Sequence, residues 1–136
     1  MLWGAPRLYI CLGFSRKWAV ARFFLFCMRI WDLEPARLCR QHLLGEHREL
    51  HALWVILTKE KTGYARHPET RRWRGKLAAL YRRHEALVAE MARRGYRHAT
   101  PLAAAAAVGL AEQKEYTDTP GEQIRILRAK GCGCRV

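Results

Sequence analysis

Residues 69–94 read ETRRWRGKLAALYRRHEALVAEMARR, and this stretch decides the fold. Apolar side chains recur in it at helical spacing and form one stripe: Trp73, Leu77, Leu80, Leu87, Val88 and Met91. Basic side chains fill the positions away from the stripe, as on an amphipathic helix with one face in a core. Gly95 follows as the C-cap. The pattern predicts one helix from about Glu69 to Arg94.

The residues before this helix favour a second one. Asp32 is the expected N-cap, Pro35 falls in the first turn, and apolar residues continue at three- and four-residue steps to Leu57. Gly45 either divides this helix or only bends it. The polar residues 58–68 are expected to form a loop.

The residues after it predict one more short helix. Residues 103–107 are a run of alanines that suits either a helix or a linker. The sequence Thr-Pro-Gly-Glu at 119–122 begins a helix that continues through Lys130 and stops at Gly131. No stretch alternates as a strand and no repeat is visible. The predicted fold is all-α, a small single-domain helical bundle.

Charge divides the chain into two parts. The 136 residues carry 25 Lys+Arg and 12 Asp+Glu, a net charge of +13 that points to a polyanionic partner, nucleic acid first and an anionic membrane second. Residues 1–27 hold four basic groups and no acid, so residues 28–136 have 21 basic groups, 12 acids and a net charge of +9. One domain fits this length.

Residues 1–27 are apolar but interrupted by basic side chains. The uninterrupted runs are shorter than the roughly 20 residues of a membrane-spanning helix, and a basic pair separates the signal-like apolar run from its cleavage-like site. A basic amphipathic helix on a membrane surface is one interpretation. The other is that translation starts at the internal Met28, where the composition changes. We expect residues 1–27 to be an extension outside the working domain of residues 28–136.

The sequence offers two weak candidates for a metal site. His42, Glu46 and Glu49 share a helix face, and a solvated polar face is the simpler interpretation because no HExxH motif is present. Cys132-Gly133-Cys134 is a single CxC pair, whereas a structural zinc site needs four ligands. The five cysteines suggest no disulfide framework and fit an intracellular protein. Free thiols and no metal are the expectation.

Three segments carry a resemblance to a known family. They are MRIW at 28–31, QHLLGEHREL at 41–50 and KLAALYRRHEALVAEMARRGY at 76–96. With them the chain resembles the phage-type pyrimidine-dimer DNA glycosylase/endonuclease V family, most closely its bacterial branch. The similarity covers residues 28–100 well, and the ending from Gln123 to Cys134 more loosely.

The resemblance implies a compact all-α DNA repair enzyme that uses no metal and no cofactor. It cuts the glycosidic bond at a pyrimidine dimer and nicks the abasic strand by β-elimination, through a Schiff base on the α-amine of the mature N-terminus. Met28 matches the nucleophile and Glu49 the assisting carboxylate. His42 and Arg48 match positions that orient the substrate and its phosphate.

The chemistry of an α-amine supports that role. Its pKa of about 7.7–8.0 leaves far more neutral amine at pH 7 than a lysine with a pKa near 10.4. Arg29 and Arg48 are expected to lower that pKa further and to hold phosphates. The charge-rich stretches at 71–74, 82–83 and 93–94 predict further phosphate contacts, with Arg72, Arg82 and Arg83 as the candidates.

Two departures from the phage pattern concern damage recognition. Ala52 stands where the phage enzyme has an arginine, and the phage enzyme's aromatic, lysine-rich C-terminal segment is absent. Trp31, Trp54 and Trp73 are expected in the core rather than stacked on bases.

We therefore expect a cytoplasmic, nucleoid-associated monomer that acts on damaged or abasic double-stranded DNA without a membrane partner. The alternatives are a non-catalytic helical module that binds DNA or RNA and, last, a membrane-surface protein that uses residues 1–27.

Overall fold

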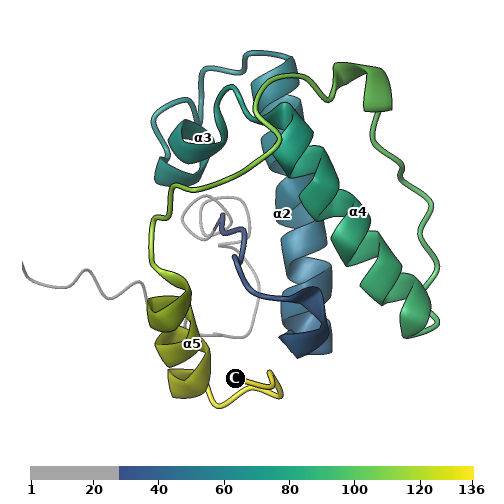
Figure 1. The fold of residues 1–136 in the computed structure, drawn as a ribbon, viewed down its shortest axis with the longest axis vertical. Coiled ribbons are helices and arrows are strands. Elements are labelled where there is room, and N and C mark those ends of the chain that lie inside the picture. Colours follow the sequence, from purple (N-terminus) through teal and green to yellow (C-terminus); the bar gives the residue numbers. More distant parts are fainter. Residues whose placement is uncertain (1–27) are drawn as a thin grey trace, which may run out of the picture.

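The computed structural model describes residues 28–136, so the predicted extension at 1–27 lies outside the described residues. In chain order the elements are the 3-10 turn η2 (Pro35–Arg37), α2 (Arg40–Thr58), α3 (Pro68–Trp73), α4 (Leu77–Arg93), the 3-10 turn η3 (Ala104–Ala106) and α5 (Pro120–Ala129). Figure 1 shows α2 and α4 side by side, with α3 beside the end of α2 and α5 lower down, on the side of α2 away from α4. Within residues 28–136 the only β-type pairing is one isolated bridge between Lys76 and Gly109. The all-α prediction is confirmed.

The core lies between α2 and α4. The residues before α2, from 28 to 38, cover one side of it. Its fully or nearly fully buried side chains come from every part of the described chain: Ile30, Leu38, Leu43, Leu50, Leu53, Leu80, Leu87 and Leu127. Trp31, Trp54 and Trp73 are also buried, as predicted. Burial of these large side chains supplies most of the driving force for folding.

The predicted single helix over 69–94 is wrong, because the chain breaks between Trp73 and Leu77. Gly75 has φ +75°, a left-handed conformation that suits glycine. The first free N–H groups of α4 donate to a distant strand-like segment, Ala78 to the Val108 carbonyl at 2.9 Å and Ala79 to the Leu110 carbonyl at 3.1 Å. The break is therefore stabilised by residues about 30 positions away.

Gly109 allows the backbone around it to approach the break at Gly75 closely. It has φ +86°, and a Cβ placed on it would collide with the backbone carbonyl of Gly75. The two glycines allow the segment 108–110 to lie directly against the break between α3 and α4. Neither contact is visible in the local pattern of residues 69–94.

The prediction of Asp32 as an N-cap is also wrong. Asp32 stands before η2, and α2 begins after Cys39, whose extended backbone makes it the N-cap residue. The Asp32 carboxylate instead accepts from Arg72 at 3.1 Å and from the Gln123 amide at 2.8 Å. Gly45 lies inside α2, which continues through it as one helix.

The last helix agrees with the sequence. Thr119 caps α5 in a capping box: its hydroxyl accepts from the Glu122 N–H, and the Glu122 carboxylate accepts from the Thr119 N–H. Pro120 occupies the first turn and α5 ends at Ala129, with Gly131 (φ +61°) just beyond. None of the helices in residues 28–136 has the length and apolar character needed to cross a membrane.

Candidate functional site

The segment 28–33 is held in place by a buried polar network. It lies between α2 and α5 (Figure 1). Arg72 of α3 donates to the Ile30 carbonyl at 2.8 Å and pairs with Asp32 at 3.1 Å. Glu69 accepts from the Ile30 N–H at 3.4 Å and from Arg72 at 3.0 Å. The backbone next to position 28 is therefore fixed by α3.

Met28 and Arg29 are positioned differently at the start of that segment. The Met28 side chain is buried in the core, which anchors the backbone nitrogen of this residue. The Arg29 side chain is partly exposed, pairs with Asp118 at 2.7 Å and lies 5.0 Å from the centre of the Trp31 ring. Asp118 thus balances part of the charge that Arg29 places beside position 28.

Lys130 adds a second cation here that the sequence did not point to. Its ammonium lies 5.6 Å from the centre of the Trp31 ring and 3.5 Å from His42 Nε2. Burial, and then the charge of Arg29, lower the pKa of Lys130. Burial, and then Lys130, lower the pKa of His42. Packing of α5 brings Lys130 to this position, so no local motif signals it.

Glu49 lies on α2 two turns after His42, and the two residues share one edge of the helix. Its side chain is half-buried; burial raises its pKa, and the neighbouring Arg48 acts against that rise. Glu46, one turn earlier, is fully buried, and both its oxygens accept from Arg83, at 2.6 and 2.9 Å. Of these two carboxylates, Glu49 is the one that a ligand can reach.

Two of the predicted phosphate-binding arginines face inward, which corrects their placement. Arg72 is only 5% exposed, and all three of its guanidinium nitrogens donate inside the protein. Arg83 is bound to Glu46 and also donates to the Leu33 carbonyl at 2.7 Å. Both arginines offset buried carboxylates, so we leave them out of the DNA-facing surface.

Arg48 and Arg82 have the exposure that a phosphate contact requires. Arg48 is exposed on α2 beside Glu49, and Arg82 is exposed on α4, where it donates to the Ala111 carbonyl at 3.4 Å. Their role in binding stays a prediction.

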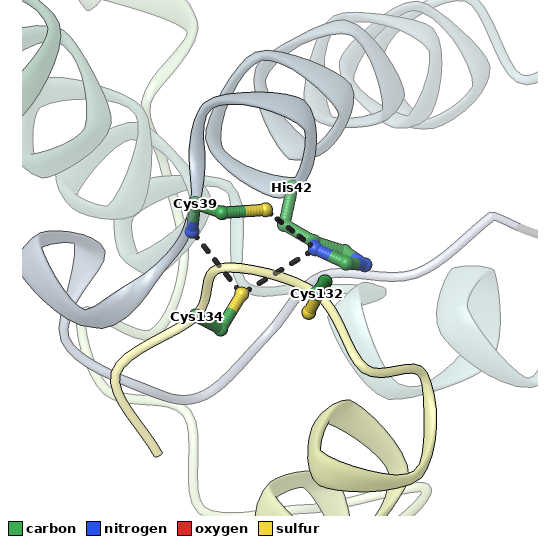
Figure 2. A group of neighbouring side chains, drawn as sticks. All are labelled: Cys39, His42, Cys132 and Cys134. Atoms are coloured by element: carbon green, nitrogen blue, oxygen red, sulfur yellow. Dashed lines mark hydrogen bonds between the residues drawn. The ribbon is translucent and has the colours of Figure 1, made fainter.

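Three cysteines and His42 gather where α2 begins (Figure 2). Cys39 and His42 come from the start of α2, and Cys132 and Cys134 come from the tail after α5. The four donor atoms lie within 4.8 Å of one another. From the sequence we considered the CxC pair as a zinc site but did not pair it with Cys39 and His42. The spacing Cys39-x2-His42 is one that zinc ligands can have.

A second cluster joins four histidines between α2 and α4: His47, His51, His84 and His98. His51 Nε2 lies 3.2 Å from the Nε2 atoms of both His47 and His84, and His84 Nδ1 lies 2.9 Å from Glu85. Burial and the three neighbouring rings lower the pKa of His47 to about 4. The four donor atoms also lie within 4.8 Å of one another, but this cluster contains no thiol.

Comparison with known proteins supports the resemblance. The family model described as pyrimidine dimer DNA glycosylase matches residues 28–104, more than half of the chain. The match begins at Met28, where the composition changes, and includes Glu49. No curated protein and no solved structure matches the chain.

Proposed function

The chain belongs to the pyrimidine dimer DNA glycosylase family, and we propose that its active form cuts the glycosidic bond at a pyrimidine dimer and then nicks the abasic strand. The nucleophile is the α-amine of Met28, freed by a translation start or a cleavage at this position. The observation that carries the proposal is the family match that begins at Met28, on a backbone that the Arg72 network holds rigid.

A free amine at position 28 suits the first step. Neutral amine attacks C1′ of the damaged nucleotide, the C1′–N bond breaks, and the base leaves with the bonding electrons and takes up a proton. The new secondary amine loses its proton and the C1′–O4′ bond opens, which gives an imine between Met28 and the sugar. With residues 1–27 attached, the nitrogen of Met28 is an amide and cannot form an imine.

Charge near position 28 favours the neutral amine. Arg29 and Lys130 lie within a few ångströms of the Trp31 ring, and nearby cations lower the pKa of an amine. The ion pair between Arg29 and Asp118 reduces this effect. The same cations attract the phosphates that flank the lesion.

Glu49 is the proposed acid–base residue. Its negative charge stabilises the positive charge that develops on the sugar as the base leaves. It then removes a C2′ proton, the electrons form a C2′=C3′ bond, and the 3′ phosphate leaves. A carboxylate whose pKa is raised by burial accepts that proton more readily than an exposed one. Water finally hydrolyses the imine and restores the amine.

The test compares two forms of the protein on DNA with a single abasic site. Borohydride reduces an imine to a stable amine, so an enzyme that forms the imine becomes covalently attached to DNA. We expect residues 28–136, made with Met28 as the first residue, to be trapped and the 1–136 form not to be. N-terminal acetylation of the shorter form is the matched control and abolishes trapping.

Equal trapping of both forms would exclude the Met28 amine as the nucleophile. Trapping of neither form, together with DNA binding that weakens steeply with salt, would favour the alternative of a non-catalytic DNA-binding module. A duplex that carries one pyrimidine dimer then tests the glycosylase step separately from the strand cleavage.

A further inference from the structure

We propose that Cys39, His42, Cys132 and Cys134 form a structural zinc site. These four side chains come from two places far apart in the sequence, yet their donor atoms lie within 4.8 Å of one another (Figure 2). The site goes beyond the repair activity proposed above, in which no metal takes part. It also does not depend on that activity.

The distances between the donor atoms come close to those around a tetrahedral ion. With Zn–S bonds of about 2.3 Å and a Zn–N bond of about 2.0–2.1 Å, neighbouring ligands are separated by about 3.5–3.8 Å. His42 Nδ1 lies 3.0 Å from Cys39 Sγ and 3.4 Å from Cys134 Sγ. Small side-chain rotations therefore bring the four atoms around one centre, and the ring already turns its Nδ1 toward the sulfurs.

The donor set selects the metal. Three thiolates and one imidazole are a soft, nitrogen-containing set that favours zinc over calcium or magnesium, and three cysteines with one histidine are a usual structural combination. The sequence supplies the ligands as two short pairs, C-x2-H and C-x-C, and structural zinc sites also take their ligands from closely spaced pairs. All four ligands come from the protein, so no position is left open for catalysis.

The surroundings fit a bound ion. The Cys39 N–H donates to Cys134 Sγ at 3.1 Å, the kind of amide contact that stabilises a thiolate ligand. Three thiolates and one Zn²⁺ carry a net charge of −1, and Lys130 lies 3.5 Å from His42 Nε2 to balance it. The Cys132 thiol, which donates to the Leu127 carbonyl at 3.6 Å, loses its proton when it binds.

The two ligand pairs are held near each other by contacts outside the cluster. The Arg135 N–H donates to the Arg37 carbonyl at 2.7 Å, and Arg37 Nε donates to the Arg135 carbonyl at 3.0 Å. The Arg135 guanidinium also donates to the Ala36 carbonyl at 2.8 Å. The tail after α5 is thus bound to η2. These contacts hold the two ligand pairs close together independently of the four ligand side chains. Zinc would join two parts of the chain that are 95 residues apart.

The experiment measures metal in the full 1–136 chain, purified with its thiols reduced. We expect one zinc ion per chain by elemental analysis. Replacement by Co²⁺ should produce the visible bands of tetrahedral cobalt and a thiolate-to-cobalt charge-transfer band, which histidine ligands alone cannot give. Chelation should lower the thermal midpoint, and added zinc should restore it.

Variants assign the ligands. The C132S/C134S protein should lose the zinc and the charge-transfer band, whereas C11S/C27S, which removes the two cysteines of residues 1–27, should keep both. H42C should also keep the metal, because a set of four cysteines is a structural zinc site too. It remains informative if the double serine variant fails to fold.

The proposal is overturned by a reduced, folded chain that takes up no zinc. It is equally overturned if the C132S/C134S protein retains the charge-transfer band, or if the zinc is lost on changing His98 instead. None of these readouts involves DNA cleavage, so failure of the zinc site and failure of the repair activity are separate results.

Discussion

Replacing Arg72 tests whether this arginine belongs to the core or to the DNA surface. Arg72→Met keeps the length of the side chain but leaves Glu69 and Asp32 without their guanidinium partner, although both are largely buried. Removing one member of a buried ion pair costs about 3–5 kcal/mol. A small domain has only about 5–15 kcal/mol in total. We expect R72M to remain folded but to lose a large part of its stability.

Urea unfolding measures this loss. With a slope of about 1–3 kcal/mol per molar urea, the midpoint should fall by roughly 2 M. Arg71→Met is the matched control, since Arg71 is the exposed neighbour on α3 and its loss should change stability by less than about 0.5 kcal/mol. R72K, which keeps the charge but not the forked geometry, should lie between the wild type and R72M.

The loss in free energy of unfolding caused by R72M should also depend on pH. Burial raises the pKa of Glu69 even with Arg72 present, and loss of Arg72 raises it further. A carboxyl whose pKa is higher in the folded state stabilises the fold below its unfolded pKa, and this contribution is lost as the pH rises. The R72M deficit should therefore be smaller at about pH 4.5, near the unfolded pKa of a glutamate, than at about pH 7. A variant as stable as R71M that has lost DNA affinity would refute the structural role of Arg72.

Three further predictions concern the site and its surroundings. Glu49→Gln in the 28–136 form should lower strand cleavage by about 10²–10⁴-fold, as for loss of a general base, with unchanged affinity for abasic DNA; loss of affinity instead would make Glu49 a binding residue. Arg48→Ala should weaken binding to all DNA sequences alike and reduce the slope of log K against log salt by about one contact, whereas Arg83, which is paired with Glu46, is not expected to contribute to that slope. For His47, whose pKa is lowered from 6.5 to about 4, folding favours the neutral ring, so stability should fall by up to about 3 kcal/mol between about pH 6.5 and 4. His47→Gln should flatten that fall in urea unfolding, and an unchanged pH dependence would contradict the assignment.

The local patterns predicted helices better than they predicted where helices end. The start of α5 is signalled by four consecutive residues, Thr-Pro-Gly-Glu at 119–122, and the predicted helix start is confirmed. The break at Gly75 depends on carbonyls at 108 and 110, which no window around residue 75 contains. Asp32 has the chemistry of an N-cap, but its partners are Arg72 and Gln123, brought from 40 and 91 residues away.

The net charge of the sequence did not show which basic side chains lie in the interior. The charge of +9 over residues 28–136 indicated a polyanionic partner, and the family match agrees with DNA. Several of those cations serve the interior instead. Besides Arg72 and Arg83, Arg94 donates to Glu90 and to the carbonyls of Pro35, Ala36 and Leu38. The sequence gives the number of charged side chains, but only the fold shows which of them a ligand can reach.

The last residues of the described chain also determine when the domain can be completed. During synthesis, residues up to the end of α4 can already pack α2 against α4, since these contacts lie within residues 40–93. Two hydrogen bonds to the early part of the chain form only after α5 and the tail have been synthesised. In one the Gln123 amide donates to Asp32, and in the other the Arg135 N–H donates to the Arg37 carbonyl. The segment that leads out from position 28 is thus made before α2 and α4 but is among the last to find all its partners. A nascent chain paused before α5 would hold a formed helical pair beside an incompletely held segment 28–33, so arrest at successive lengths should reveal two folding events.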